Sequence, residues 1–167
     1  FIVSILTQKT ISKKIELEGV GIHTGKKVKL KLIPALPNTG IIFKRTDLNF
    51  NNIVFPNYSN VTDTTLCTTI SNEYGVKVST IEHLMGALYG IGVDNLNIEL
   101  DSQEVPIMDG SAKEFVNSIN KVGLKSSDQA IKIIKVNKKI SINDFEKNIS
   151  LEQSNVTGDI AVSYTHL

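Results

Sequence analysis

Polar and apolar residues alternate strictly along part of the chain. Val28, Leu30 and Leu32 are separated by lysines at positions 27, 29 and 31. A period of two predicts a strand with one face in the core and the other in water, and the lysines are expected on the solvated face. Four further strands are expected at 40–45, 66–70, 76–78 and 96–100, with the second and third forming a hairpin across 72–75.

Two other stretches have the period of a helix. Ser79 and Glu82 have the spacing of a capping box, and an apolar stripe with helical spacing follows, which predicts a helix over about 80–89 that ends at the glycines 90 and 92. A second box, Ser111 with Glu114, predicts a helix that Gly123 terminates. Strands and helices in this order predict an α+β fold, a two-layer domain of sheet and helices.

The polar segment 125–129 is predicted to be a linker between two domains. We expect an N-terminal α+β domain over 7–125 and the incomplete start of a second one over 130–167, with strands in 131–136 and 139–151. The second segment has too few residues for a core of its own. Residues 1–6 are expected to be an upstream or non-native extension. Because the chain lacks an initiator Met and its last residues form no cap, it is expected to be a fragment.

Composition narrows the class of protein. With 167 residues and 41% hydrophobic content, the chain can bury a sizeable core, which excludes disorder as the main state. Eighteen basic and 17 acidic residues leave no charge excess for nucleic acid. The single cysteine cannot form an internal disulfide, and no apolar run approaches the roughly 20 residues that span a bilayer, so a cytoplasmic location is expected.

Glu82 and His83 are the sharpest candidates for chemistry. His83 is expected opposite the apolar stripe of its helix, grouped with Gly86, Ala87 and Gly90, where another segment could pack closely or a metal site could form. The residue pattern alone nevertheless favours a capping role for Glu82 and a structural role for a lone histidine. A catalytic zinc normally has three protein ligands, and the spacing of the three histidines indicates no metal site.

Two glycine-containing turns also stand out. Residues 19–25 hold three glycines and His23, and residues 106–112 hold Asp109 at a strand-to-helix turn. Neither fits a nucleotide phosphate loop, and tight turns are the favoured interpretation. In the second turn we expect Asp109 to orient backbone amides and Ser111 to cap the helix.

Seven short motifs occur in one order along the chain. They are Gly-Val-Gly-Ile-His-Thr-Gly (19–25), Ala-Leu-Pro-Asn-Thr-Gly-Ile (35–41), Arg-Thr-Asp-Leu (45–48), Leu-Cys-Thr (66–68), Ser-Thr-Ile-Glu-His-Leu (79–84), Gly-Val-Asp-Asn (92–95) and Pro-Ile-Met-Asp-Gly-Ser-Ala (106–112). This series closely resembles the UDP-3-O-acyl-N-acetylglucosamine deacetylases, from about residue 7 to residue 123. The resemblance implies two similar α+β domains with zinc at their junction, a UDP-sugar substrate carrying an acyl chain, and a monomer at full length.

The resemblance also implies roles for single residues. Glu82 matches the general base that activates a zinc-bound water, and His83 matches a zinc ligand. Leu66 and Cys67 match the wall of the substrate and metal cleft, while His23 and Asp109 are expected to have supporting structural roles.

The chain departs from the family in what it lacks. The family's other two zinc ligands, in a His-x-x-x-Asp helix, and its general-acid histidine are absent here, and His166 is not expected to replace them. No family signal is apparent after about residue 157. The chain alone is therefore predicted to be inactive.

Two alternatives stay open. The chain could be a non-catalytic α/β module that binds RNA or a protein through Lys27, Lys29 and Lys31. It could also be a related sugar-nucleotide enzyme with the same fold and different chemistry.

Overall fold

The computed structural model describes residues 6–153, except 133, 135 and 146. The chain divides into two compact units, one ending at Ile131 and the other beginning at Lys132. The first holds both helices and ten of the described strands, and the second holds one hairpin. The chemistry predicted above therefore falls in the first unit.

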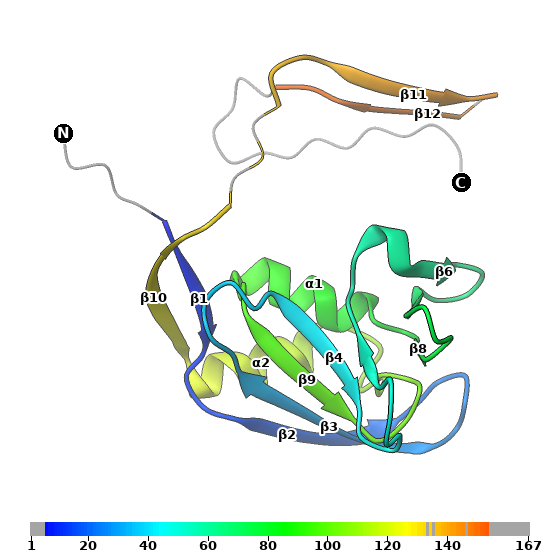
Figure 1. Cartoon of the computed structure of the whole chain (residues 1–167), viewed down its shortest axis with the longest axis vertical. Coiled ribbons are helices and arrows are strands. Elements are labelled where there is room, and N and C mark those ends of the chain that lie inside the picture. Colours follow the sequence, from blue (N-terminus) through cyan, green and yellow to red (C-terminus); the bar gives the residue numbers. More distant parts are fainter. Residues whose placement is uncertain (1–5, 133, 135, 146, 154–167) are drawn as a thin grey trace. The chain divides into compact units, whose positions relative to one another are not determined.

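A five-stranded sheet is the centre of the first unit (Figure 1). Its strands, in spatial order, are β2 (Ile15–Val20), β3 (Lys27–Pro34), β9 (Leu96–Leu100), β4 (Ile41–Arg45) and β5 (Ile53–Val54). β4 and β9 run parallel, whereas the other neighbours are antiparallel. The strands predicted at 27–32, 40–45 and 96–100 are confirmed.

Two helices lie against one face of this sheet (Figure 1). They are α1 (Glu82–Ile91) and α2 (Lys113–Val122), which end at Gly92 and Gly123, both with positive φ. Leu84 and Leu88 of α1 pack in one buried cluster with Phe115 of α2 and with the inward side chains of β3, β4 and β9. The predicted two-layer α+β class is confirmed.

The lysine face of β3 is solvated, as its alternation predicts. Val28, Leu30 and Leu32 are buried, and the intervening lysines are exposed. The sheet register places acids opposite these lysines. Glu18 faces Lys29, while Glu16 and Glu99 face Lys31 on either side. The exposed face of β3 and its two neighbours therefore carries charges of both signs, which weakens the case for a module that binds RNA or a protein through these lysines.

A small three-stranded sheet follows β5 and a short 3-10 helix (Tyr58–Asn60). It consists of β6 (Val61–Asp63), β7 (Thr69–Ser71) and β8 (Lys77–Val78). The predicted hairpin across 72–75 is confirmed, but its first strand begins at Thr69, and residues 66–68 lie outside any strand. The sequence pattern missed β6 as the partner of β7.

The segment 125–129 is not a linker of irregular structure, and that prediction is wrong. It lies within β10 (Leu124–Ala130), which pairs with β1 (Thr7–Ile11) in a separate two-stranded sheet. Most side chains of β10 are exposed. Its sequence is mostly polar and lacks the alternation of polar and apolar residues that would predict a strand. Its partner also comes from the opposite end of the unit, which no local pattern can indicate.

The second unit contains the antiparallel hairpin of β11 (Ile140–Asp144) and β12 (Lys147–Leu151). Strands within 139–151 are thus confirmed, whereas the described residues of 131–136 are not in a strand. In the part of the chain that the structure describes, no helix is long and apolar enough to cross a membrane.

Candidate functional site

Helix α1 begins at Glu82 without the predicted capping box. The N-cap position is Ile81, and no side chain caps the helix. Ser79 instead pairs with the chain after β9: its N–H and its hydroxyl both donate to the carbonyl of Gln103, at 2.8 and 3.2 Å. The first capping box is therefore wrong, because a long-range pairing occupies Ser79 and Thr80 has a positive φ before the helix starts.

The Glu82 carboxylate points away from the helix start and toward residue 68. Its Oε2 accepts a hydrogen bond from the Thr68 backbone N–H at 3.0 Å. The Ile81 N–H donates to the Thr68 carbonyl at 3.5 Å. Both the N–H and the carbonyl of Thr68 are therefore bonded to residues at the start of α1. Glu82 is therefore brought next to the segment that carries Leu66 and Cys67.

A hollow of about 520 Å³ lies beside the residues that precede α1. It brings together three of the residues predicted from sequence, and adds polar residues from β8 and from the chain after β9. Its lining includes His23, Leu66, Cys67, Lys77, Ser79 and Gln103. Leu66 is 81% exposed at this hollow, and the Cys67 thiol is half-buried, 3.6 Å from the Thr69 hydroxyl.

His23 reaches this hollow from the turn between β2 and β3. Its backbone N–H donates to Oε1 of Glu104 at 3.0 Å, and the Thr24 N–H donates to Oε2 at 2.8 Å. His23 as a whole is exposed to solvent. A supporting structural contact of this turn is thus present, although it comes from the backbone of His23.

Asp109 does not line the hollow. Its Oδ1 accepts hydrogen bonds from the N–H and the hydroxyl of Ser111, at 3.0 and 2.8 Å, and these bonds lower the pKa of the Asp109 carboxyl below its ordinary value. The Ser111 hydroxyl in turn accepts from the Lys113 N–H. Asp109 therefore orients backbone groups in the turn before α2. The predicted second capping box is wrong: the N-cap position of α2 is Ala112, no side chain caps the helix, and the Ser111 hydroxyl accepts from the N–H of Lys113 instead of Glu114.

His83 lies half-buried on α1, and the face around it differs in part from the prediction. Gly86 and Gly90 are exposed, with open space where a Cβ would lie, but Ala87 is buried in the core at 2% exposure. Ala87 therefore belongs to the packed side of the helix, and its assignment to the open face is wrong.

The described residues do not complete a zinc site. Within residues 6–153, leaving aside the three that are not described, no three His, Cys, Asp or Glu side chains gather closely enough to hold a metal ion. His83 is thus a single candidate donor, whereas a catalytic zinc takes three protein ligands. His166 lies outside the described residues.

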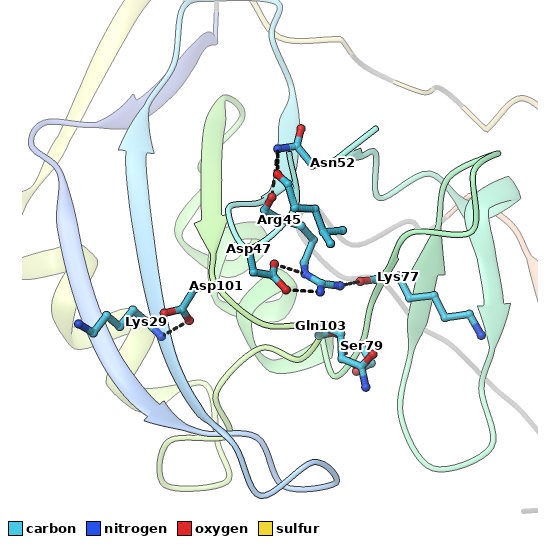
Figure 2. Close-up of polar contacts among 9 residues, drawn as sticks. Lys29, Arg45, Asp47, Asn52, Lys77, Ser79, Asp101 and Gln103 are labelled. Atoms are coloured by element: carbon cyan, nitrogen blue, oxygen red, sulfur yellow. Dashed lines mark hydrogen bonds and ion pairs between the residues drawn. The ribbon is translucent and has the colours of Figure 1, made fainter. Parts of the chain in front are cut away.

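Arg45 of the central sheet bonds to the small sheet at Lys77 (Figure 2). Its guanidinium donates to both carboxylate oxygens of Asp47, at 2.7 and 2.6 Å, and to the Lys77 carbonyl at 2.8 Å. Lys77 lines the hollow, so the hydrogen bond from Arg45 fixes the backbone of one lining residue. Arg45 belongs to the motif at 45–48, but no role was predicted for it, although its position two residues after Phe43 on the buried face of β4 was a usable signal.

The structure thus defines an α+β layered protein with a hollow beside the residues that precede α1; Glu82 and His83 do not line this hollow. A family model described as UDP-3-O-acyl N-acetylglycosamine deacetylase matches residues 8–166. The chain belongs to this family. The expectation that family signal ends near residue 157 is therefore wrong.

Curated relatives agree with this assignment. The chain is similar to the UDP-3-O-acyl-N-acetylglucosamine deacetylase of Histophilus somni, with 48% identity over 144 residues, which cover 86% of this chain and 47% of the relative. It is also similar to that of Sodalis glossinidius, with 42% identity over 164 residues, 97% of this chain and 53% of the relative. The chain therefore spans about half the length of the curated relatives that it matches.

Proposed function

We propose that this chain is the N-terminal half of an enzyme that hydrolyses the N-acetyl group of UDP-3-O-acyl-N-acetylglucosamine, the committed step of lipid A biosynthesis. The observation that carries the proposal is membership of the deacetylase family, with 48% identity to a relative of that name. The full-length protein is proposed to be a cytoplasmic monomer.

Glu82 is proposed as the general base that takes a proton from the attacking water. It lies at the first position of α1, beside the segment of Leu66 and Cys67, which are proposed as wall residues of the substrate cleft. A carboxylate in hydrogen-bonding reach of water can act in this way, and such catalysis typically contributes 10²–10⁴-fold to a rate.

His83 is proposed as one zinc ligand. A bound zinc would supply a water of lowered pKa, near 7. Because no three donor side chains gather in the described residues, the remaining ligands and the general-acid histidine are proposed to lie in the part of the full-length protein that this chain does not include. The chain alone is accordingly proposed to be inactive.

The test compares this chain with a form extended to the length of the relatives. Zinc content and release of acetate from UDP-3-O-acyl-N-acetylglucosamine are measured for both. We expect the extended form to bind about one zinc and to turn over, and the chain alone to do neither. Turnover by the chain alone would contradict its inactivity, and metal-independent turnover by the extended form would contradict the mechanism.

A further inference from the structure

Glu104 is an acidic residue with no solvent exposure, at 0%. It follows β9 on the same alternation as Leu96, Ile98 and Leu100, so its side chain points to the buried side of the chain. No ion pair in the described part of the chain involves this carboxylate. A buried charge of this kind is unfavourable unless hydrogen bonds compensate it.

Hydrogen bonds from two separate segments compensate the charge. The successive backbone N–H groups of His23 and Thr24 donate to the two oxygens, at 3.0 and 2.8 Å, and consecutive N–H groups of this kind form a small anion-binding nest. The Thr80 hydroxyl donates to Oε1 at 3.0 Å. Burial by itself would raise the pKa of Glu104, but these bonds outweigh it and hold the pKa below its ordinary value.

The turn at 21–25 is built to admit this carboxylate. A Cβ on Gly21 would overlap both the Glu104 carboxylate and the Thr24 hydroxyl, so the glycine leaves the space that the carboxylate occupies. The Gly21 N–H and carbonyl meanwhile close the turn through bonds to Lys26 and Gly25. The position of Glu104 and the shape of the turn that carries His23 therefore depend on each other.

Thr80 has a left-handed backbone conformation, with φ of 57°. This conformation is uncommon for a β-branched residue, and strain of this kind costs about 1–3 kcal/mol. It persists because the neighbours are held: Ser79 pairs with the chain around Glu104, and the Thr80 hydroxyl bonds to the carboxylate. Helix α1 begins two residues later, at Glu82.

We infer that Glu104 is a positioning residue, which locks Thr80 and the 21–25 turn together and thereby sets where Glu82 lies relative to the hollow that His23 lines. Its relevance to catalysis rests on the proposed function. The geometric part of the inference does not, because the Thr68 N–H, which donates to Glu82, reports the position of that carboxylate directly.

The test uses the extended, full-length form and the variants Glu104→Gln, Thr80→Val and Thr80→Ser. Glu104→Gln replaces one acceptor oxygen by an NH₂ group, which donates. Thr80→Val removes the hydroxyl and keeps the shape of the side chain, whereas Thr80→Ser keeps the hydroxyl. The control is Glu18→Gln on the exposed face of β2. We measure kcat and KM for deacetylation, thermal unfolding, and hydrogen exchange of the Thr68 amide.

We expect kcat of Glu104→Gln and Thr80→Val to fall about 10- to 100-fold with KM changed less than about twofold, as for a misplaced catalytic group. Exchange at Thr68 should become at least about tenfold faster. Thr80→Ser and Glu18→Gln should remain near the unmodified protein in both readouts. Should Glu104→Gln fail to fold, the comparison of Thr80→Val with Thr80→Ser gives the answer by itself.

Unchanged Thr68 exchange and unchanged kcat in variants that are merely less stable would overturn the inference, because Glu104 would then serve the fold alone. An inactive unmodified protein would instead contradict the proposed function. In that case faster Thr68 exchange in Glu104→Gln and Thr80→Val would still support the positioning role, and unchanged exchange would still overturn it.

Discussion

Oε2 of Glu82 lies 3.0 Å from the backbone nitrogen of Thr68, whose N–H it binds. A carboxylate at the first turn of a helix usually satisfies that helix's own N–H groups, so its direction here is informative. The contact joins α1 to the segment that carries Leu66 and Cys67, and it leaves the start of the helix without a side-chain cap.

Replacing Glu82 by glutamine should abolish most activity and leave the fold intact. Glutamine keeps an acceptor oxygen for the Thr68 N–H but cannot take a proton from water. We expect deacetylation by the full-length form to fall about 10²–10⁴-fold, with zinc content unchanged. Glu73→Gln, in the exposed turn at 72–75, is the control and should retain activity. An active Glu82→Gln variant would exclude Glu82 as the base.

Glycine-to-alanine substitutions should have opposite effects at two positions. Gly21→Ala should destabilise the chain by about 1–3 kcal/mol, because the added methyl overlaps the Glu104 carboxylate. Gly86→Ala, on the exposed side of α1 with open space around it, should stabilise by about 0.5–1 kcal/mol. Urea unfolding of the two variants measures both changes. A Gly21→Ala variant that is as stable as the unmodified chain, or more stable, would contradict the packing described at Gly21.

The stability contributed by Asp47 should depend on pH. The hydrogen bonds from Arg45 hold the pKa of Asp47 below its ordinary value, so the folded state binds a proton less readily than the unfolded state, whose pKa is about 3.9. The carboxylate therefore stabilises the chain above about pH 4, and this stabilisation is lost as the pH falls through the folded-state value.

Asp47→Asn removes this contribution. The difference in unfolding free energy between the unmodified chain and the variant should be largest at pH 7 and should shrink toward pH 3, as measured by urea titration at both values. Asp128→Asn, on exposed β10, is the control and should change the free energy by less than about 0.5 kcal/mol at pH 7. An Asp47→Asn difference that is the same at both pH values would contradict the assignment.

Substituting Lys27, Lys29 and Lys31 by alanine should barely affect function. All three lysines are exposed; Lys29 and Lys31 lie opposite acids on the neighbouring strands, Lys27 lies opposite Val20, and exposed ion pairs contribute little. We expect deacetylation by the full-length form within about twofold of the unmodified protein. Loss of binding to an RNA or a protein in this variant would instead revive the binding-module alternative.

The sequence predicted those parts of the fold that local periodicity determines. The alternation at 28, 30 and 32 identified the buried face of β3, and Gly92 and Gly123 marked the ends of both helices. The capping box failed because Ser79 pairs with Gln103, and no spacing within 79–82 carries that information. Residues 125–129 were misjudged because their partner strand lies at the other end of the unit.

The site was predicted less completely than the fold. Family resemblance singled out Glu82 with Leu66 and Cys67. In the structure Glu82 binds the Thr68 N–H, next along the chain from Cys67, and of the three only Leu66 and Cys67 line the hollow. Glu104 was missed although the alternation of β9, continued to position 104, points it inward. Its residue type gave no signal, because ionised residues are rarely fully buried.

The placement of β9 at the middle of the central sheet has a consequence for biosynthesis. β3 and β4 are translated well before β9, and neither is hydrogen-bonded to the other in the finished sheet. While the chain is being made, each of these strands exposes an unpaired edge until residues 96–100 follow. Such edges can pair with other chains, so this half of the protein should depend on chaperones or rapid completion of synthesis to avoid aggregation.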